Sequence, residues 1–99
     1  MIRKKWEINE AYKEASIEIL QDNLPALRVK VGINQEELAN IIGLSRQSYY
    51  PLESKKRKMS WSVYLALIFF FSACTESAEM LKELRIYPID LVMRFNEQL

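Results

Sequence analysis

The sequence predicts an all-α protein, a compact bundle of about five to six helices. Apolar residues recur at three- and four-residue spacing along most of the 99 residues, as they do on one face of a helix. No segment sustains an alternation of apolar and polar residues, and the Asn-Gly and Asp-Gly pairs typical of hairpin turns are absent. Most of the two glycines and three prolines fall where helices should begin or end.

The first two predicted helices cover about residues 8–22 and 24–31. The expected inward face of the first consists of apolar residues at helical spacing: Ile8, Tyr12, Ala15 and Ile19. The polar pair Asp22–Asn23 interrupts this pattern. Pro25 then suits the first turn of the second helix, where its missing N–H does little harm. Gly32 follows as the left-handed residue that ends that helix.

A third helix is predicted by the signals at its two ends. Asn34 can accept hydrogen bonds from the first backbone N–H groups, and Glu37 can bond back to it, as in a capping box. Its inward face consists of Leu38, Ala39 and Ile42. Gly43 ends this helix, and Ser45 can begin the next one as its N-cap. Two helices joined by a three-residue turn that contains glycine have the length typical of a helix-turn-helix.

The fourth predicted helix begins after Ser45 and contains Pro51. Helical geometry divides its side chains between an inward side, Tyr49 and Leu52, and an outward side, Arg46, Gln47 and Tyr50. Proline at this position removes the N–H that would bond the Gln47 carbonyl, and it disfavours helical dihedral angles at the residue before it. We therefore expect this helix to be kinked or short.

Further helices are predicted in the C-terminal part of the chain. Ser60 or Ser62 caps an apolar helix that ends near Cys74, and Thr75 caps another over about residues 76–85. A tyrosine–proline pair then breaks the pattern. A last, short amphipathic helix is indicated by four apolar residues: Ile89, Val92, Met93 and Leu99.

The chain is long enough for one domain. We expect residues 1–99 to form a single domain with a core over 24–74, preceded by the helix 8–22 and followed by a helical extension, 75–99. The side chains of Phe69–Phe71 cannot all face one side of a helix, so something outside the small core should cover one of them. Together with the apolar residues of the extension, they indicate a homodimer formed through the C-terminal helices.

Composition argues against an enzyme and against a metal site. Histidine is absent, which removes the commonest general base and the imidazole ligand of zinc. The single cysteine, Cys74, cannot form an internal disulfide or a four-thiolate site. The sequence contains no recognisable nucleophile–base pair or glycine-rich phosphate loop, so we expect no catalysis, no cofactor and no identifiable small-molecule ligand. The longest apolar run, Val63 to Cys74, has 12 residues. A membrane-spanning helix needs roughly 20, so we expect a cytoplasmic protein without a membrane partner.

Charge is unevenly distributed along the chain. The whole sequence carries a net charge of only +1, but residues 44–60 hold five basic and one acidic side chain. Most of this charge belongs to a basic run, Lys55, Lys56, Arg57 and Lys58. Lysine and arginine release counterions when they contact nucleic-acid phosphate, and screening limits their attraction to about 10 Å, so a local patch is enough for binding. A solvated loop is the other interpretation of this run.

The stretch from Leu24 to Phe71, about half of the chain, contains several motifs that match the pattern of one protein family. These are Leu27–Arg28, the segments GINQEELA and GLSRQ, and Leu52–Glu53 followed by the basic run. Together they resemble the lambda-repressor-like, or xenobiotic-response-element type, helix-turn-helix regulators. Pro51 departs from the pattern of that family, which normally has a polar or small residue at this position.

The resemblance implies a sequence-specific DNA-binding transcriptional regulator of bacterial or phage type, a repressor, whose fourth helix enters the major groove of double-stranded DNA. In that family the residue at the position of Gln35 contacts the DNA backbone. The residues at the positions of Arg46 and Gln47 reach base edges, where arginine can hydrogen-bond guanine and glutamine can hydrogen-bond adenine. The residues matching Arg28 and Glu53 form a structural ion pair. The expected DNA-binding residues are Gln35, Ser45, Arg46, Gln47, Ser48, Tyr50, Lys55, Lys56, Arg57 and Lys58.

A second interpretation is a helical protein-interaction module that keeps this scaffold without reading DNA, because a fold does not dictate a function. Pro51 favours this interpretation. The two differ in a measurable way, since DNA binding should weaken steeply with salt. A basic cluster near the N-terminus, Arg3, Lys4 and Lys5, is interpreted either as a frayed terminus or as an arm that reaches DNA.

Overall fold

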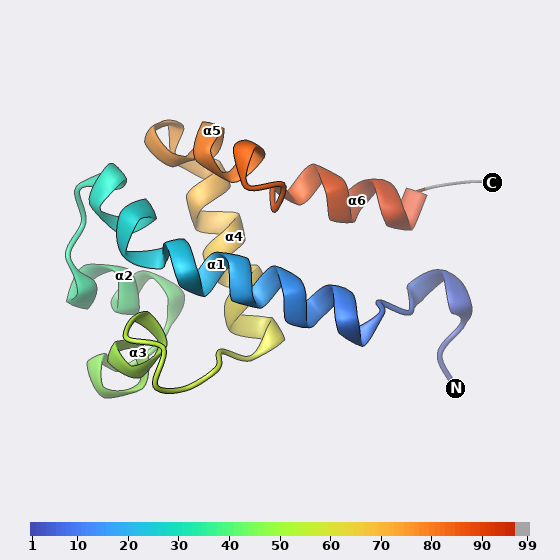
Figure 1. The fold of residues 1–99 in the computed structure, drawn as a ribbon, viewed down its shortest axis with the longest axis horizontal. Helices are drawn as coiled ribbons and strands as arrows, with labels where there is room; N and C mark the ends of the chain where they lie inside the picture. The colour runs from blue at the N-terminus through green and yellow to red at the C-terminus, as the bar shows by residue number, and fades with distance from the viewer. Residues whose placement is uncertain (97–99) are drawn as a thin grey trace.

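The computed structural model describes residues 1–96, and within them it contains six α-helices, one short 3-10 helix and no strand. The elements are η1 Lys4–Trp6, α1 Glu10–Val31, α2 Gln35–Ile42, α3 Arg46–Glu53, α4 Trp61–Ala73, α5 Thr75–Glu83 and α6 Pro88–Asn96 (Figure 1). The predicted all-α class is confirmed for this part of the chain.

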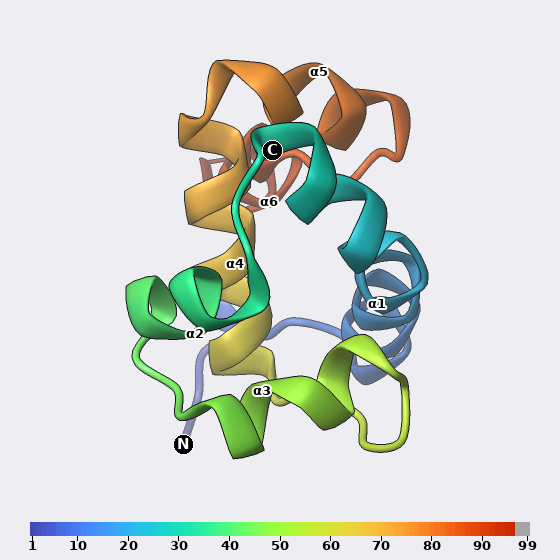
Figure 2. The ribbon, with the colours of Figure 1, turned by 90° about the vertical axis from the view of Figure 1, so that its left-hand side faces the viewer.

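Helices α1 and α4 form the centre of the bundle. Figure 1 shows α1 crossing α4, and both views place α3 at one end of this pair and α5 at the other (Figures 1 and 2). The fully buried apolar side chains come from all five of the first α-helices: Leu20, Leu24, Leu27, Leu38, Tyr49, Leu67, Phe71 and Leu81. This core holds α3 against α1, and it holds α2 against α3 and α4.

Helix α1 is one continuous helix of 22 residues, so the predicted break at Asp22–Asn23 is wrong. Pro25 lies inside the helix rather than in the first turn of a new one. The reason is that the buried leucines at positions 20, 24 and 27 form one stripe that runs through the predicted break. Burying that stripe outweighs the cost of about 3 kcal/mol for a proline inside a helix.

The inward face of α1 also differs from the predicted one. The buried residues are Ser16, Ile17, Leu20, Gln21, Leu24 and Leu27. Of the predicted set, Ala15 is exposed, and Ile8, Tyr12 and Ile19 are only half-buried. Within residues 8–22 alone, the predicted stripe and the stripe that includes Ile17 and Leu20 are similarly apolar. The second stripe faces the core because it continues into Leu24 and Leu27 in the same helix.

The end signals predicted for α2 are confirmed. The Asn34 side chain accepts a hydrogen bond from the Glu37 N–H at 2.8 Å, and the Glu37 carboxylate accepts one from the Asn34 N–H at 2.9 Å. Gly32 and Gly43 end α1 and α2 with φ angles of 82° and 81°. This left-handed conformation suits glycine because it has no Cβ.

Helix α3 is short, eight residues, but it continues through Pro51 to Glu53. The expected departure of Tyr50 from helical geometry is therefore wrong. The physical reason is the anchoring of α3 on both sides of the proline, by Tyr49 at 0% exposure and Leu52 at 4%. The last turn stays helical because these two side chains are held in the core.

The C-terminal helices follow the predicted order with one correction. Of the two predicted caps, Ser60 is the one that caps α4, through the Val63 N–H, and Ser62 lies inside the helix. Thr75 does not cap α5 but is its first residue, because Cys74 alone separates the two helices. Helix α6 agrees with the predicted last helix, although Leu99 lies outside the described residues.

The three phenylalanines of α4 have different surroundings. Phe71 is buried, Phe70 is half-buried, and Phe69 is 74% exposed. Helix α6 packs beside the start of α1, where the Arg94 guanidinium lies 4.7 Å from the centre of the Tyr12 ring. No part of the described chain covers most of the Phe69 ring.

Among residues 1–96, no helix by itself is long and apolar enough to cross a membrane. Helices α4 and α5 together pass that test of length and composition, but they are bent by 118° at their junction.

Candidate nucleic-acid interface

Helix α3 presents a polar face because its two large apolar side chains, Tyr49 and Leu52, are buried. The exposed outward residues are the predicted ones: Arg46, Gln47 and Tyr50. At the beginning of the helix, the Ser45 hydroxyl accepts a hydrogen bond from the Ser48 N–H at 3.1 Å. The N-cap therefore fixes the first turn, from which Arg46 and Gln47 project.

Arg46 lies between a carboxylate and an aromatic ring. Its Nη1 atom is 3.4 Å from Oε1 of Glu36 on α2, and its guanidinium carbon is 5.9 Å from the centre of the Tyr50 ring. The side chains of Arg46 and Glu36 are 57% and 67% exposed, so this contact can exchange for another partner at little cost. Glu36 was not among the predicted site residues, because its only signal in the sequence is an acidic residue in the first turn of α2.

Arg28 and Glu53 form the predicted ion pair. Arg28 Nη2 is 2.9 Å from Glu53 Oε1, and Arg28 Nε is 3.0 Å from Glu53 Oε2, with side chains 18% and 7% exposed. The same carboxylate accepts hydrogen bonds from the Gln35 amide at 3.0 Å and from the Tyr49 hydroxyl. We call Arg28, Gln35, Tyr49 and Glu53 the ion-pair cluster; it joins α1, α2 and α3.

The ion-pair cluster keeps its charges. Burial acts to raise the pKa of Glu53, but the hydrogen bonds from Arg28, Tyr49 and Gln35 outweigh burial and hold the pKa below its ordinary value. The hydrogen bond to Glu53 raises the pKa of Arg28. Burial, and then the hydrogen bond to Glu53, raise the pKa of Tyr49. The Gln35 amide nitrogen points into this cluster, whereas the resemblance implies a contact with DNA.

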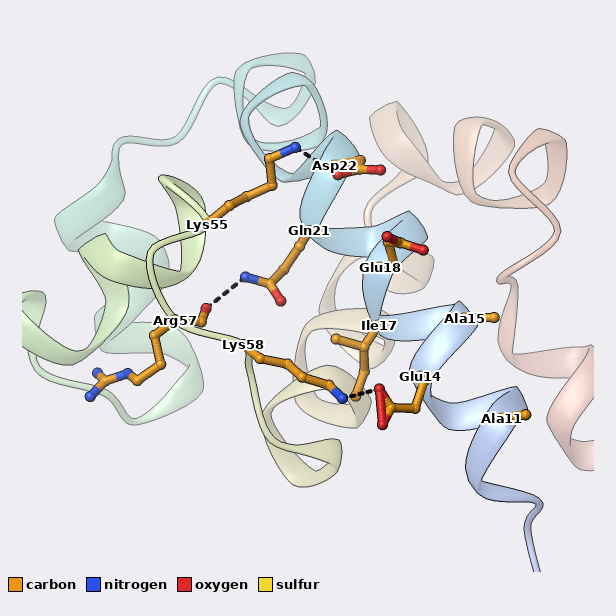
Figure 3. Close-up of a pocket in the computed structure, with 10 residues that line it drawn as sticks. All are labelled: Ala11, Glu14, Ala15, Ile17, Glu18, Gln21, Asp22, Lys55, Arg57 and Lys58. Atoms are coloured by element: carbon orange, nitrogen blue, oxygen red, sulfur yellow. Dashed lines mark hydrogen bonds and ion pairs between the residues drawn. The ribbon is translucent and has the colours of Figure 1, made fainter.

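Two side chains of the basic loop, residues 55–58, point toward α1. Lys55 Nζ lies 2.8 Å from Asp22 Oδ1, and Lys58 forms an ion pair with Glu14. Figure 3 shows both lysines extended from the loop to the carboxylates of α1. The sequence pattern did not indicate these two contacts.

The other two residues of the basic loop do not reach α1. Figure 3 shows the Arg57 side chain pointing away from α1, and its Nη2 atom donates a hydrogen bond to the Ser48 carbonyl of α3 at 3.2 Å. Lys56 is exposed. The basic run is thus divided, and Arg57 is the member that lies against α3.

Gln21 of α1 holds the backbone of the basic loop, although it is 6% exposed and polar. Its Nε2 atom donates to the Leu52 carbonyl at 2.8 Å and to the Arg57 carbonyl at 2.9 Å. Its Oε1 atom accepts from the Met59 N–H at 3.2 Å. Gln21 was not among the predicted site residues, because a glutamine among acidic neighbours gives no sign of burial in the sequence.

Two other kinds of site, a metal site and a reactive cysteine, are not indicated by the described residues. Within 1–96, no group of three or more His, Cys, Asp or Glu side chains is placed to hold a metal ion. Cys74 is half-buried, and burial raises the pKa of its thiol. Six of the ten predicted binding residues lie on α3, at its N-cap or against it: Ser45, Arg46, Gln47, Ser48, Tyr50 and Arg57. No protein-family model, curated protein or solved structure matches the chain.

Proposed function

We propose that the chain is a binding protein rather than an enzyme: a sequence-specific DNA-binding transcriptional regulator, a repressor of bacterial or phage type, that acts in the cytoplasm. The observation that carries the proposal is the exposed face of α3, with Arg46, Gln47 and Tyr50 on a short helix that follows α2 after three residues. A helix of this kind can lie in the major groove of double-stranded DNA while the preceding helix crosses the backbone. The resemblance over residues 24–71 supports the same function.

The side chains of α3 have the chemistry that base reading requires. The Arg46 guanidinium can donate to O6 and N7 of guanine, and the Gln47 amide can pair with adenine, each contact supplying about 1–3 kcal/mol of discrimination. Arg57 lies beside α3 and can contact phosphate, which positions the protein without specifying a sequence. The Arg46 guanidinium lies beside Glu36 and Tyr50, and its exposed contact with Glu36 can exchange for a base edge.

A homodimer is part of this proposal. Exposed apolar residues lie on α4 and α6: Leu65, Phe69, Ile89, Val92 and Met93. A groove of about 150 Å³ between α4 and the start of α6 continues this surface. Two copies related by a two-fold axis would read the two halves of a palindromic site, about 10 base pairs apart. Light scattering should give the mass of a dimer, and a monomer at high concentration would contradict this part of the proposal.

The function is tested by selecting bound sites from random duplex DNA with the wild-type chain, Arg46→Ala and Arg85→Ala. Arg85 is exposed beyond α5, so its substitution removes the same charge far from α3. We expect an enriched motif for the wild type and Arg85→Ala, and loss of preference at one base for Arg46→Ala. Absence of any enriched motif, or equal motifs from all three proteins, would contradict the proposed reading of DNA by α3.

The second candidate function is a protein-interaction module, which the exposed apolar surface of α4 and α6 favours. Because α3 continues through Pro51, that residue does not favour this candidate. The module predicts DNA binding that is absent or weak at every salt concentration, and an Arg46→Ala variant that behaves as the wild type. The site selection and a salt titration therefore separate the two candidates.

A further inference from the structure

Three carboxylates on α1 face the basic loop. Glu14, Glu18 and Asp22 recur at four-residue spacing, so they lie in a row along one side of the helix, which we call the acidic ridge. Asp22 pairs with Lys55 at 2.8 Å and Glu14 pairs with Lys58, while Glu18 adds attraction on Lys55. A groove of about 590 Å³ separates the ridge from the loop, and the two lysines bridge it (Figure 3).

The backbone of the basic loop is held in place, so an exchange of ionic partner involves side chains alone. Besides the bonds from Gln21, the N–H groups of Lys56 and Arg57 donate to the Pro51 carbonyl at 2.9 and 3.2 Å. Lys55 has a φ of 64°, in the left-handed region that residues other than glycine seldom occupy. The surrounding hydrogen bonds maintain this conformation, which places Lys55 opposite Asp22.

We infer that the acidic ridge competes with nucleic-acid phosphate for Lys55 and Lys58 and thereby weakens DNA binding by its own chain. The inference rests on the proposed function. The side chains of Lys55 and Lys58 are 58% and 53% exposed, so water reaches both pairs and phosphate can replace the carboxylates. Arg57 points to α3 and needs no such exchange.

The basic loop therefore contains two kinds of cation, which differ in whether a carboxylate of the acidic ridge already holds them. Arg57 contributes to binding directly, whereas each lysine must first leave a carboxylate, so part of its attraction to phosphate is cancelled. The hydrogen bond that Lys55 donates to Asp22 raises the pKa of Lys55, which agrees with a lysine held by the ridge. Removing the carboxylates should release both lysines for phosphate.

The test compares two variants of equal net charge with the wild type in binding a labelled duplex of mixed sequence over a series of salt concentrations. The ridge variant carries Glu14→Gln, Glu18→Gln and Asp22→Asn. The control variant carries Glu76→Gln, Glu79→Gln and Glu83→Gln, all exposed on α5 at the end of the molecule opposite α3 (Figures 1 and 2). The wild type is the reference.

We expect the ridge variant to bind about 3- to 10-fold more tightly than the control variant at low salt, since two exposed ion pairs no longer compete. Two additional phosphate contacts should also make the slope of log K against log salt steeper by about 1.8. Equal binding by the two variants would overturn the competition alone. Absence of DNA binding by all three proteins would overturn the proposed function as well.

A measurement without DNA tests the ridge itself. Acylation of each lysine with an amine-reactive ester, followed by mass spectrometry, compares Lys55 and Lys58 with Lys56 of the same loop. Because an amine held against a carboxylate is less available to the ester, Lys55 and Lys58 should react about two- to fivefold faster in the ridge variant than in the wild type, and Lys56 should not change. Unchanged rates at Lys55 and Lys58 would show that the ridge does not hold them, which overturns the inference.

Discussion

The ion-pair cluster and the acidic ridge both connect α1 to the region around α3, yet they differ in burial and in the number of bonds they make. Glu53 is 7% exposed and accepts hydrogen bonds from three residues, and one of these, Arg28, donates through both Nε and Nη2. Asp22 and Lys55 are 50% and 58% exposed and share a single contact. The distances are similar, 2.9 and 2.8 Å.

The difference shows that the surroundings of an ion pair, rather than its length, decide its role. The interaction of two charges is several times stronger where water is excluded than at the surface, and a buried charge left without its partner is costly. The ion-pair cluster therefore holds three helices in one arrangement. The ridge pairs are weak enough to exchange, which is what a surface that binds another molecule requires.

The largest expected effect is that of Glu53→Gln on stability. The variant leaves the Arg28 guanidinium half-buried without its carboxylate, so we expect the free energy of unfolding to fall by about 3 kcal/mol. Urea unfolding followed by circular dichroism measures this change. The matched control, Glu79→Gln on the exposed face of α5, should be close to wild type. Equal free energies of unfolding for the two variants would contradict the claim that the buried pair stabilises the fold more than exposed pairs do.

Gln21→Ala tests whether the loop depends on a buried amide rather than on its ion pairs. The variant removes the side-chain partner of the Arg57 carbonyl and of the Met59 N–H, and it leaves the Leu52 carbonyl with a backbone partner, the Lys55 N–H. We expect a loss of about 2 kcal/mol, because buried polar groups without partners are costly. Amide hydrogen exchange should also become faster at Met59. Wild-type exchange in this variant would contradict a structural role for Gln21.

The pH dependence of stability sharpens the comparison. The folded pKa of Glu53 lies below its ordinary value of 4.5, which we take for the unfolded chain. Its stabilising effect is thus fully present above 4.5 and is lost as the pH falls through the folded value. The difference in unfolding free energy between wild type and Glu53→Gln should be constant near neutral pH and should narrow below 4.5. A difference that widens in acid would contradict the lowered pKa.

The smallest expected effect is that of Asp22→Asn. Because its contact with Lys55 is open to water, we expect no measurable change in the temperature of unfolding. Differential scanning calorimetry of Asp22→Asn and of Glu53→Gln measures the temperature of unfolding for an exposed and for a buried ion pair. A decrease as large as that of Glu53→Gln would show that the ridge is structural rather than exchangeable.

Local signals in the sequence predicted the helix ends around α3 well. The capping box of Asn34 and Glu37, the left-handed Gly43 and the N-cap at Ser45 each act within four residues, so a short pattern contains all of their partners. The same locality explains the errors. Pro25 and Pro51 are unfavourable for an isolated helix, but the buried side chains beside them come from a core that no local pattern describes.

The candidate interface was predicted only in part, and the missed contacts are long-range. Outward placement of Arg46, Gln47 and Tyr50 followed from helical geometry, which depends on spacing alone. The contacts of Lys55 with Asp22 and of Lys58 with Glu14 join residues 33 and 44 positions apart. The amide of Gln21 reaches Arg57 over 36 positions.

By itself, the sequence determined the all-helical class, the ends of α2 and the start of α3, and the polar face that α3 presents. Each of these depends on backbone hydrogen bonds and on side chains within one or two turns. Only the tertiary structure decided that α1 is continuous, that Gln21 is buried, and that two lysines of the basic loop face carboxylates. These depend on which surfaces meet when the core closes, because burial sets both the strength of a charge pair and the cost of a helix break.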